Sequence, residues 1–232
     1  MKRIGFIGGY DKTDLILNIA KILTVLGNRV LVIDATVSQK ARYVVPVINP
    51  TTMYVTEYEE IDIAVGFHHE DDIKKYLGIA EDLDSEYDIV LVDTDNSEGF
   101  QEFYLEGANK NYFVTSFDVY SLKRGLEALT GIGSAITLTK VLFSKEMLKE
   151  EDDYLNFLSL GYKVIWDENR IYFPVENGDM SVIYENQRVA NIKFKKLSIQ
   201  YKDGLAYIAE EILGDTSDSK VRRAIKTIEK GA

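Results

Sequence analysis

Hydrophobic positions near the start of the chain form one continuous run and then a helical repeat. Residues 3–7 are apolar apart from Arg3 and Gly5 and lead into Gly8, and apolar residues then recur every three or four positions over 15–26. Gly27 ends that repeat. This order predicts a strand, a glycine turn and a helix.

Two later apolar runs end in an acidic residue. Residues 29–33 are followed by Asp34, and residues 87–92 by Asp93. Nearly uninterrupted apolar strands are typical of a parallel sheet covered on both faces. In such sheets ligands bind at the carboxyl ends of the strands, where Gly8, Asp34 and Asp93 would all lie.

The rest of the chain continues the alternation of strands and helices. Further predicted strands are 112–117, 138–143, 162–166 and 170–173, and further predicted helices are 121–129, 147–158 and 197–212. Residues 36–67 fit this alternation least, and we expect extra edge strands at 43–48 and 53–58. The pattern predicts an α/β fold with a doubly wound, mostly parallel sheet in three α/β/α layers. Without a linker or internal repeat, we expect one domain over 1–214 and a basic amphipathic tail over 215–232.

The amino-acid composition excludes several classes of protein and of functional site. The chain has 232 residues, of which 46% are hydrophobic and 28% charged, as in a soluble globular domain. The absence of cysteine excludes disulfides, thiolate catalysis and cysteine-ligated metal centres. A formal charge of -11 disfavours broad contact with nucleic acid or anionic lipid. Since no apolar run reaches the ~18 residues of a membrane span, we expect a cytoplasmic protein.

The glycine turn carries most of the chemistry of a phosphate-binding loop. Such a loop needs glycines for converging amides, a lysine for phosphate charge and a hydroxyl for magnesium. The candidate nucleotide contacts here are Gly8, Gly9, Tyr10, Asp11, Lys12, Thr13 and Asp14. The candidate magnesium ligands are Thr13, Asp34 and Asp93.

The loop resembles the deviant Walker A motif of the ParA/MinD family of P-loop ATPases. That motif reads lysine, two glycines, any residue, glycine, lysine, threonine, then threonine or serine. Residues 30–34 and 87–94 are similar to the family's second strand and Walker B strand, and residues 114–125 to the strand and helix that follow. Phe173-Pro174, before an acidic residue and a helix, resembles the family's segment near adenine. The resemblance implies the P-loop NTPase fold, and it adds Ser144 and Pro174 as candidate nucleotide contacts.

Four departures set this chain apart from the family pattern. Ile7 replaces the signature lysine that reaches across an ATP-bound dimer, and Asp11 replaces the third glycine of the loop. Thr36 stands where the family has a second switch acid, and Ser144 where it has an adenine-reading asparagine. The resemblance therefore implies weakened ATP binding, with Asp34 as the one candidate catalytic residue.

The resulting leading hypothesis is a ParA/MinD-like protein that hydrolyses ATP weakly or not at all. It would act as a homodimeric positioning or scaffold module for a pilus, secretion, conjugation or partition system, with TadZ-like localisation proteins as the functional analogy. Both ATP or ADP with magnesium and no cofactor remain open. The alternatives are a slow magnesium-dependent ATPase and a DNA-segregation protein.

Plainer interpretations compete with each of these. The glycines suit a tight turn without ligand, and Asp34 and Asp93 suit caps of neighbouring turns. Asp95 and Asn96 are turn residues by composition. Adjacent His68 and His69 point in divergent directions, so a helix start is favoured there over a metal site.

The tail adds a basic amphipathic segment. Its apolar face would consist of Val221, Ala224, Ile225 and Ile228. Membrane contact, partner docking and an ordinary surface helix all stay open for it. With Lys193, Lys195 and Lys196 it forms the main basic area, on which the DNA alternative depends.

Overall fold

The computed structural model describes residues 1–48, 51–174, 177–214 and 218–231. Its strands are β1 (Lys2–Ile7), β2 (Val30–Asp34), β3 (Tyr54–Tyr58), β4 (Ile61–Val65), β5 (Ile89–Thr94), β6 (Lys110–Thr115), β7 (Ile136–Leu142) and β8 (Val164–Tyr172). Its α-helices are α1 (Thr13–Val25), α2 (Ala41–Val44), α3 (Glu70–Leu77), α4 (Ser97–Glu102), α5 (Val119–Glu127), α6 (Lys149–Ser159), α7 (Asn177–Val189), α8 (Ile199–Leu213) and α9 (Asp218–Lys230). Short 3₁₀ turns lie at Leu83–Ser85 and Leu105–Gly107.

Within the described residues, eight strands form one sheet in the order β3-β4-β2-β5-β1-β6-β7-β8. Every neighbouring pair is parallel except β3 and β4, which are antiparallel. Because β2 and β6 lie on opposite sides of β1, the chain winds outward in both directions. The predicted doubly wound, mostly parallel sheet is confirmed.

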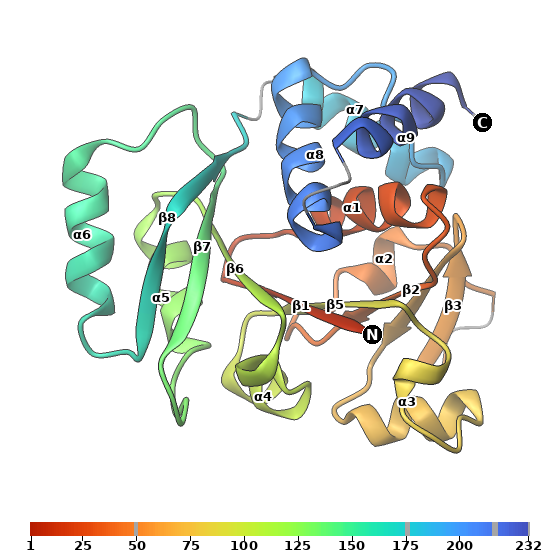
Figure 1. Ribbon diagram of the computed structural model, residues 1–232, viewed down its shortest axis with the longest axis horizontal. Coiled ribbons are helices and arrows are strands. Elements are labelled where there is room, and N and C mark those ends of the chain that lie inside the picture. Colours follow the sequence, from red (N-terminus) through yellow and green to blue (C-terminus); the bar gives the residue numbers. More distant parts are fainter. Residues whose placement is uncertain (49–50, 175–176, 215–217, 232) are drawn as a thin grey trace.

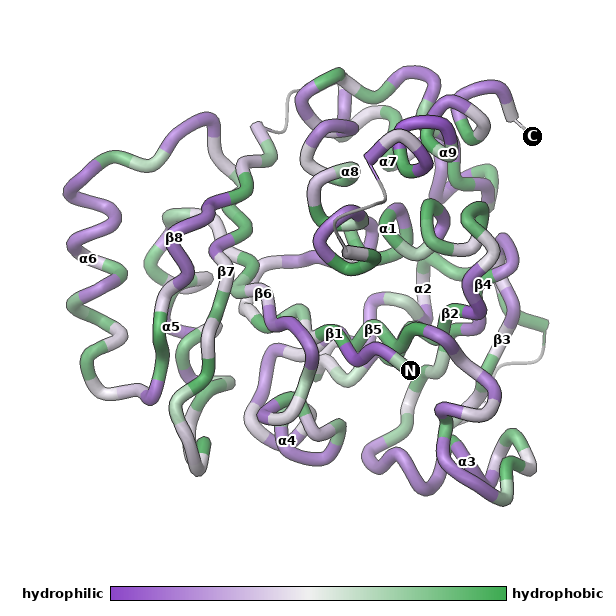
Figure 2. The backbone as a smooth tube through the Cα atoms, in the orientation of Figure 1, coloured by the Kyte–Doolittle hydropathy of each residue, from purple (hydrophilic) through white to green (hydrophobic). Residues whose placement is uncertain are grey.

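Helices cover both faces of this sheet (Figure 1). One hydrophobic core cluster combines sheet residues with α1, α2, α7, α8 and α9, and the other combines them with α3, α4, α5 and α6. Hydropathy alternates along the covering helices, as α6 and α9 show in Figure 2. The three predicted layers are therefore present, with the central strands buried between two cores.

Three predicted strands need correction. Residues 43–48 are not an edge strand, because α2 ends at Val44 and residues 45–48 form no strand; an Asp34 carboxylate oxygen accepts the amide of Ala41, the first residue of α2, at 2.9 Å. The separate strands at 162–166 and 170–173 are one strand, β8, whose register with β7 shifts between Leu138 and Lys140. The intervening residues are polar because they lie on an exposed sheet edge, and this polarity interrupts the apolar pattern.

The two antiparallel strands at the edge of the sheet differ in how well the sequence predicted them. The edge strand expected at 53–58 is confirmed as β3. Strand β4 was not predicted, since it lies in the segment of weakest pattern.

The tail begins and ends outside the described residues, at 215–217 and 232, so the predicted boundary at 214 stays a prediction. Helix α9 within it has all four predicted apolar residues buried in the core cluster that α1 and α8 share. Lys202 of α8 donates to Glu229 at 2.5 Å and fixes the far end of α9. The apolar face that membrane contact would use is thus covered. No described helix is long and apolar enough to span a membrane.

Candidate functional site

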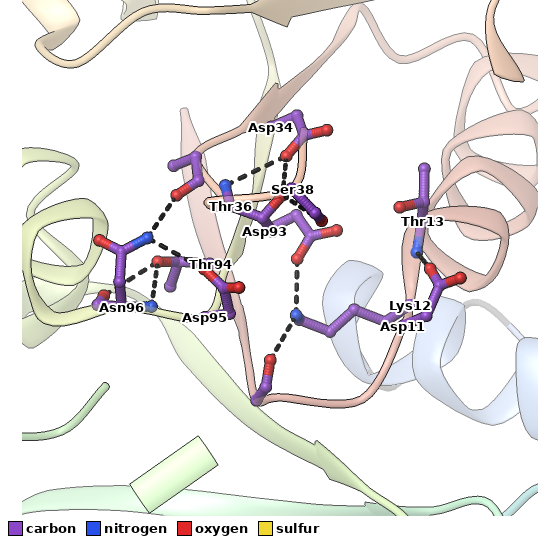
Figure 3. A network of polar contacts seen from close by, with 12 residues as sticks. Asp11, Lys12, Thr13, Asp34, Thr36, Ser38, Asp93, Thr94, Asp95 and Asn96 are labelled. Carbon is purple, nitrogen blue, oxygen red and sulfur yellow. Dashed lines mark hydrogen bonds and ion pairs between the residues drawn. The ribbon is translucent and has the colours of Figure 1, made fainter. Parts of the chain in front are cut away.

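The carboxyl ends of β1, β2 and β5 meet at one edge of the sheet, as predicted. Ile7 pairs with Thr94 in the sheet register, and Asp34 pairs with Asp93. A cavity of about 300 Å³ opens above these ends. Its lining comprises Gly8, Gly9, Tyr10, Asp11, Lys12, Thr13, Thr36, Ser38, Lys40, Tyr43, Asp93 and Asp95. Six of the seven predicted loop residues, all except Asp14, therefore line this cavity together with Asp93, and Asp34 is buried nearby (Figure 3).

The two glycines of the loop are required by packing. A Cβ on Gly8 would lie 2.0 Å from the Val114 carbonyl oxygen of β6, and the Gly8 φ is 154°. A Cβ on Gly9 would lie 2.7 Å from the Cβ of Arg124 on α5. The tight loop thus lets β6 and α5 approach β1, whether or not a phosphate is bound.

Lys12 is directed into the protein. Its ammonium lies 2.7 Å from a carboxylate oxygen of Asp93 and donates to the Gly8 carbonyl at 2.9 Å. The side chains of Lys12 and Asp93 are only 2% and 3% exposed. Complete burial raises the pKa of Asp93 to about 7, although the Lys12 ammonium acts in the opposite direction. The two groups expected to hold phosphate and magnesium are bound to each other.

Asp11 places a carboxylate at the start of α1. Its Oδ1 accepts the Thr13 amide at 3.2 Å, and its Oδ2 accepts the Lys40 ammonium at 2.5 Å. Lys40 also donates to Asp14 at 2.9 Å. Burial would lower the pKa of Lys40, but Asp14 and Asp11 together raise it. A helix N-terminus favours negative charge, so Asp11 occupies a position suited to a phosphate oxygen.

Both carboxylate oxygens of Asp34 accept hydrogen bonds from the segment that follows it. Its Oδ1 accepts from the amide and the hydroxyl of Thr36, at 3.1 Å and 2.6 Å, and its Oδ2 accepts the Ala41 amide. Asp34 is 2% exposed. These contacts agree with the interpretation of Asp34 as a cap of the neighbouring turn, and Asp34 does not line the cavity.

Asp95 and Asn96 join two loops. Asp95 accepts the Val37 amide at 2.9 Å, and the Asn96 amide group donates to the Ala35 carbonyl at 2.9 Å. Asn96 also caps α4 by accepting the Gly99 amide. The interpretation as turn residues was therefore incomplete, because these side chains tie the segment after β5 to the segment after β2.

Ser144 and Pro174 lie at the same edge of the sheet, two residues beyond the paired positions Leu142 and Tyr172. The Ser144 hydroxyl donates to the Glu146 carbonyl, and neither residue lines the loop cavity. Tyr10 stacks on Phe143 with ring centroids 4.5 Å apart. Burial raises the pKa of Tyr10, with Asp11 adding to the effect. The aromatic side chain of the loop is thus held toward the β7 end.

The predicted helix start at the histidine pair is confirmed, since α3 begins at Glu70. His68 and His69 lie 3.4 Å and 2.7 Å from Glu98 and Glu102 of the α4 region. Among the described residues, no group of three or more His, Asp or Glu side chains is placed to hold a metal ion.

Some basic residues of the C-terminal region form ion pairs with acidic residues of the same chain. Lys196 pairs with Glu185 at 3.2 Å, and Arg222 pairs with Asp218 and Asp203 at 2.7 Å and 3.3 Å. Lys193 and Lys195 are exposed. The pairing of Arg222 reduces the positive charge on which contact with DNA would depend.

Sequence reasoning missed Lys40 and Gln187. Gln187 of α7 donates to both carboxylate oxygens of Asp14, at 3.0 Å and 2.9 Å, across a separation of 173 residues. No local motif marks either residue. The charged groups around the loop therefore pair with one another, and magnesium triphosphate does not fit this arrangement unless Lys12 separates from Asp93 and Asp11 from Lys40.

Comparison with known proteins places the fold. No family model matches the sequence. No curated protein sequence matches it. A ParA family ATPase from Chlorobium tepidum superposes with a TM-score of 0.60 at 14% identity, covering 90% of this chain and 98% of that one. The cell division ATPase MinD of Pyrococcus furiosus gives 0.59 at 15% identity, with 91% and 98% covered. A chain of the MinC:MinD cell division complex of Aquifex aeolicus gives 0.56 at 17% identity, with 93% and 97% covered. The sheet order, the loop after β1 and these superpositions agree that the chain has the fold of the ParA and MinD ATPases.

Proposed function

We propose that this chain is a ParA/MinD-like positioning or scaffold module that hydrolyses ATP little or not at all. The observation that carries the proposal is the buried contact of Lys12 with Asp93 and the Gly8 carbonyl. A lysine that neutralises a carboxylate of its own chain is not free to neutralise a phosphate. Ile7 and Thr36 remove a cross-dimer cation and a water-orienting carboxylate in addition.

The proposed partner is a component of a pilus, secretion, conjugation or partition apparatus. The structural comparisons support this class of role, because proteins of the same fold include a ParA family ATPase and MinD in complex with MinC. A module of this kind needs a stable surface rather than a catalytic cycle.

Calorimetry with magnesium ATP tests the proposal. We expect no heat of binding and no phosphate release from the natural chain. Asp11→Gly removes the carboxylate at the start of α1 and is expected to give weak nucleotide binding, still without turnover. Micromolar binding together with phosphate release by the natural chain would instead support the slow-ATPase alternative, which the retained Lys12, Thr13 and Asp93 favour.

The proposed homodimer uses the edge of the sheet that carries the loop. Large apolar side chains are exposed there, including Tyr43 at 80% and Tyr120 at 71%. Such surface is typical of protein interfaces. Light scattering is expected to give the mass of a dimer, unchanged by ATP.

A pair of variants makes the dimer prediction specific. The double substitution Tyr43→Ser with Tyr120→Ser is expected to shift the mass toward a monomer. Phe157→Ser on α6 is the matched control, because Phe157 is 65% exposed but lies away from this edge. A monomeric natural chain, or equal loss of dimer in both variants, would count against the proposed face.

A further inference from the structure

The segment 35–41, which joins β2 to α2, is held in place by side chains of the chain itself. Asp34 accepts its Ala41 amide, and Asp95 accepts its Val37 amide. Each contact pairs a carboxylate with a backbone amide, a charge-assisted hydrogen bond that is stronger than a neutral one. The segment therefore has a defined position without any ligand.

Lys40 connects this segment to the rest of the site. Its ammonium lies between Asp11 of the β1–α1 loop and Asp14 of α1, and Asp14 is in turn held by Gln187 of α7. The Lys40 side chain is 29% exposed and that of Asp14 is 20% exposed, so water only partly screens this pair, whereas the Asp11 side chain is 52% exposed and its attraction to Lys40 is screened more strongly. The β1–α1 loop and α1 thus meet at one ammonium group, and α7 supports it through Asp14.

Asp11 occupies the position between the helix and the lysine. One of its oxygens accepts the first amide of α1 and the other accepts Lys40. An anion that meets both a helix N-terminus and a lysine has the surroundings that a bound phosphate has in a phosphate-binding loop. Here that anion is a side chain, so it cannot dissociate or be hydrolysed.

We propose that the Asp11 carboxylate is an internal substitute for a bound phosphate and that Lys40 uses it to latch segment 35–41 in a permanently closed position. The proposal deepens the proposed function, because a closed segment keeps Tyr43 presented beside the cavity without nucleotide. It does not depend on the dimer or on the partner, and its test measures the segment alone.

Hydrogen exchange of the natural chain and two variants tests the latch. Asp11→Gly and Lys40→Gln each break the contact between the loop and the segment. We expect the Val37 and Ala41 amides to exchange about tenfold faster in Asp11→Gly, the effect of losing one charge-assisted hydrogen bond, and faster still in Lys40→Gln, which loses the contacts with both Asp11 and Asp14. Lys21→Gln is the matched control, since Lys21 also forms an ion pair, with Glu59 at 2.8 Å, but lies outside the latch.

Addition of inorganic phosphate tests whether the Asp11 carboxylate takes the place of a phosphate or only forms a surface ion pair with Lys40. Phosphate is expected to restore slow exchange in Asp11→Gly, because the helix N-terminus and Lys40 are both still present. It should change neither the natural chain nor Lys40→Gln. Unchanged exchange in both variants would overturn the latch, and faster exchange in Asp11→Gly that phosphate does not reverse would overturn the substitution of phosphate by Asp11.

Asp11→Asn keeps the proposal testable if Asp11→Gly does not fold. It keeps an oxygen for the Thr13 amide but loses the charge that attracts Lys40, so an intermediate exchange rate is expected. If Asp11→Gly is unfolded by circular dichroism, natural exchange rates in both Asp11→Asn and Lys40→Gln would still overturn the proposal. ATP binding and the mass of the assembly are measured separately, so the latch and the proposed function can fail independently.

Discussion

Lys12→Met is expected to lower the free energy of unfolding by about 3–5 kcal/mol, because it leaves the Asp93 carboxyl buried without its cation. The side chains of the pair are nearly inaccessible, and their charged atoms lie 2.7 Å apart. Removal of one partner of a buried pair is costly, whereas removal of both is often close to neutral. The double variant Lys12→Met with Asp93→Leu should therefore recover most of the loss.

The loss of stability caused by Lys12→Met is expected to increase with pH. The pKa of Asp93 is about 7 in the folded protein, above its ordinary value, and the loss of Lys12 raises it further. A carboxyl with a raised folded pKa binds more protons folded than unfolded, so stability falls as pH rises toward that pKa. The deficit of Lys12→Met relative to the natural chain should therefore widen above pH of about 7.

Urea unfolding on both sides of that pH measures these effects. Lys196→Met is the control, because Lys196 pairs with Glu185 at the surface and should change stability by no more than about 0.5 kcal/mol. Natural stability in Lys12→Met, or a double variant no more stable than the single one, would contradict a structural role for the pair.

Gly8→Ala is the second change for which we expect a large effect, a loss of about 3 kcal/mol or more. The added Cβ would meet the Val114 carbonyl oxygen at 2.0 Å, and this oxygen belongs to the backbone of a central strand. Backbone cannot rotate away as a side chain can. Either β1 separates from β6 or the loop changes its path, and both break contacts at the centre of the sheet.

Two other glycines provide a graded comparison. Gly9→Ala meets the Cβ of Arg124 at 2.7 Å, a less severe approach than the 2.0 Å at Gly8, so we expect a smaller loss of about 1–3 kcal/mol. Gly161→Ala meets no atom within 4 Å and should change stability by no more than about 0.5 kcal/mol. Denaturant midpoints in any other order would show that packing does not explain the requirement for glycine at positions 8 and 9.

Sequence reasoning predicted the site to the extent that its residues are close along the chain. The loop 8–13 was recognised from its own spacing, and Asp34 and Asp93 from their positions after apolar strands. Parallel strands bring their carboxyl ends to one edge, so these residues had to meet once the sheet was predicted. The placement of Asp34 and Asp93 followed from that rule, but their bonding partners did not.

Weak patterns account for the errors in the fold. Segment 43–48 has β-branched residues that predicted a strand, yet Asp34 accepts the Ala41 amide at the start of α2, which extends to Val44. Strand β8 appeared as two pieces because its middle residues are polar at an exposed edge. In both cases tertiary contacts or exposure outweighed local propensity.

The sequence by itself determined the alternation of strands and helices, the loop after the first strand and the presence of Ile7, Asp11 and Thr36 around it. These properties are local, since hydrophobic period and motif spacing are set within a few residues. Only the tertiary structure decided that Lys12 is bound to Asp93 and that Lys40 meets Asp11 and Asp14. Ion pairs between distant residues depend on how strands and helices pack, and packing brings together charges that no sequence spacing relates.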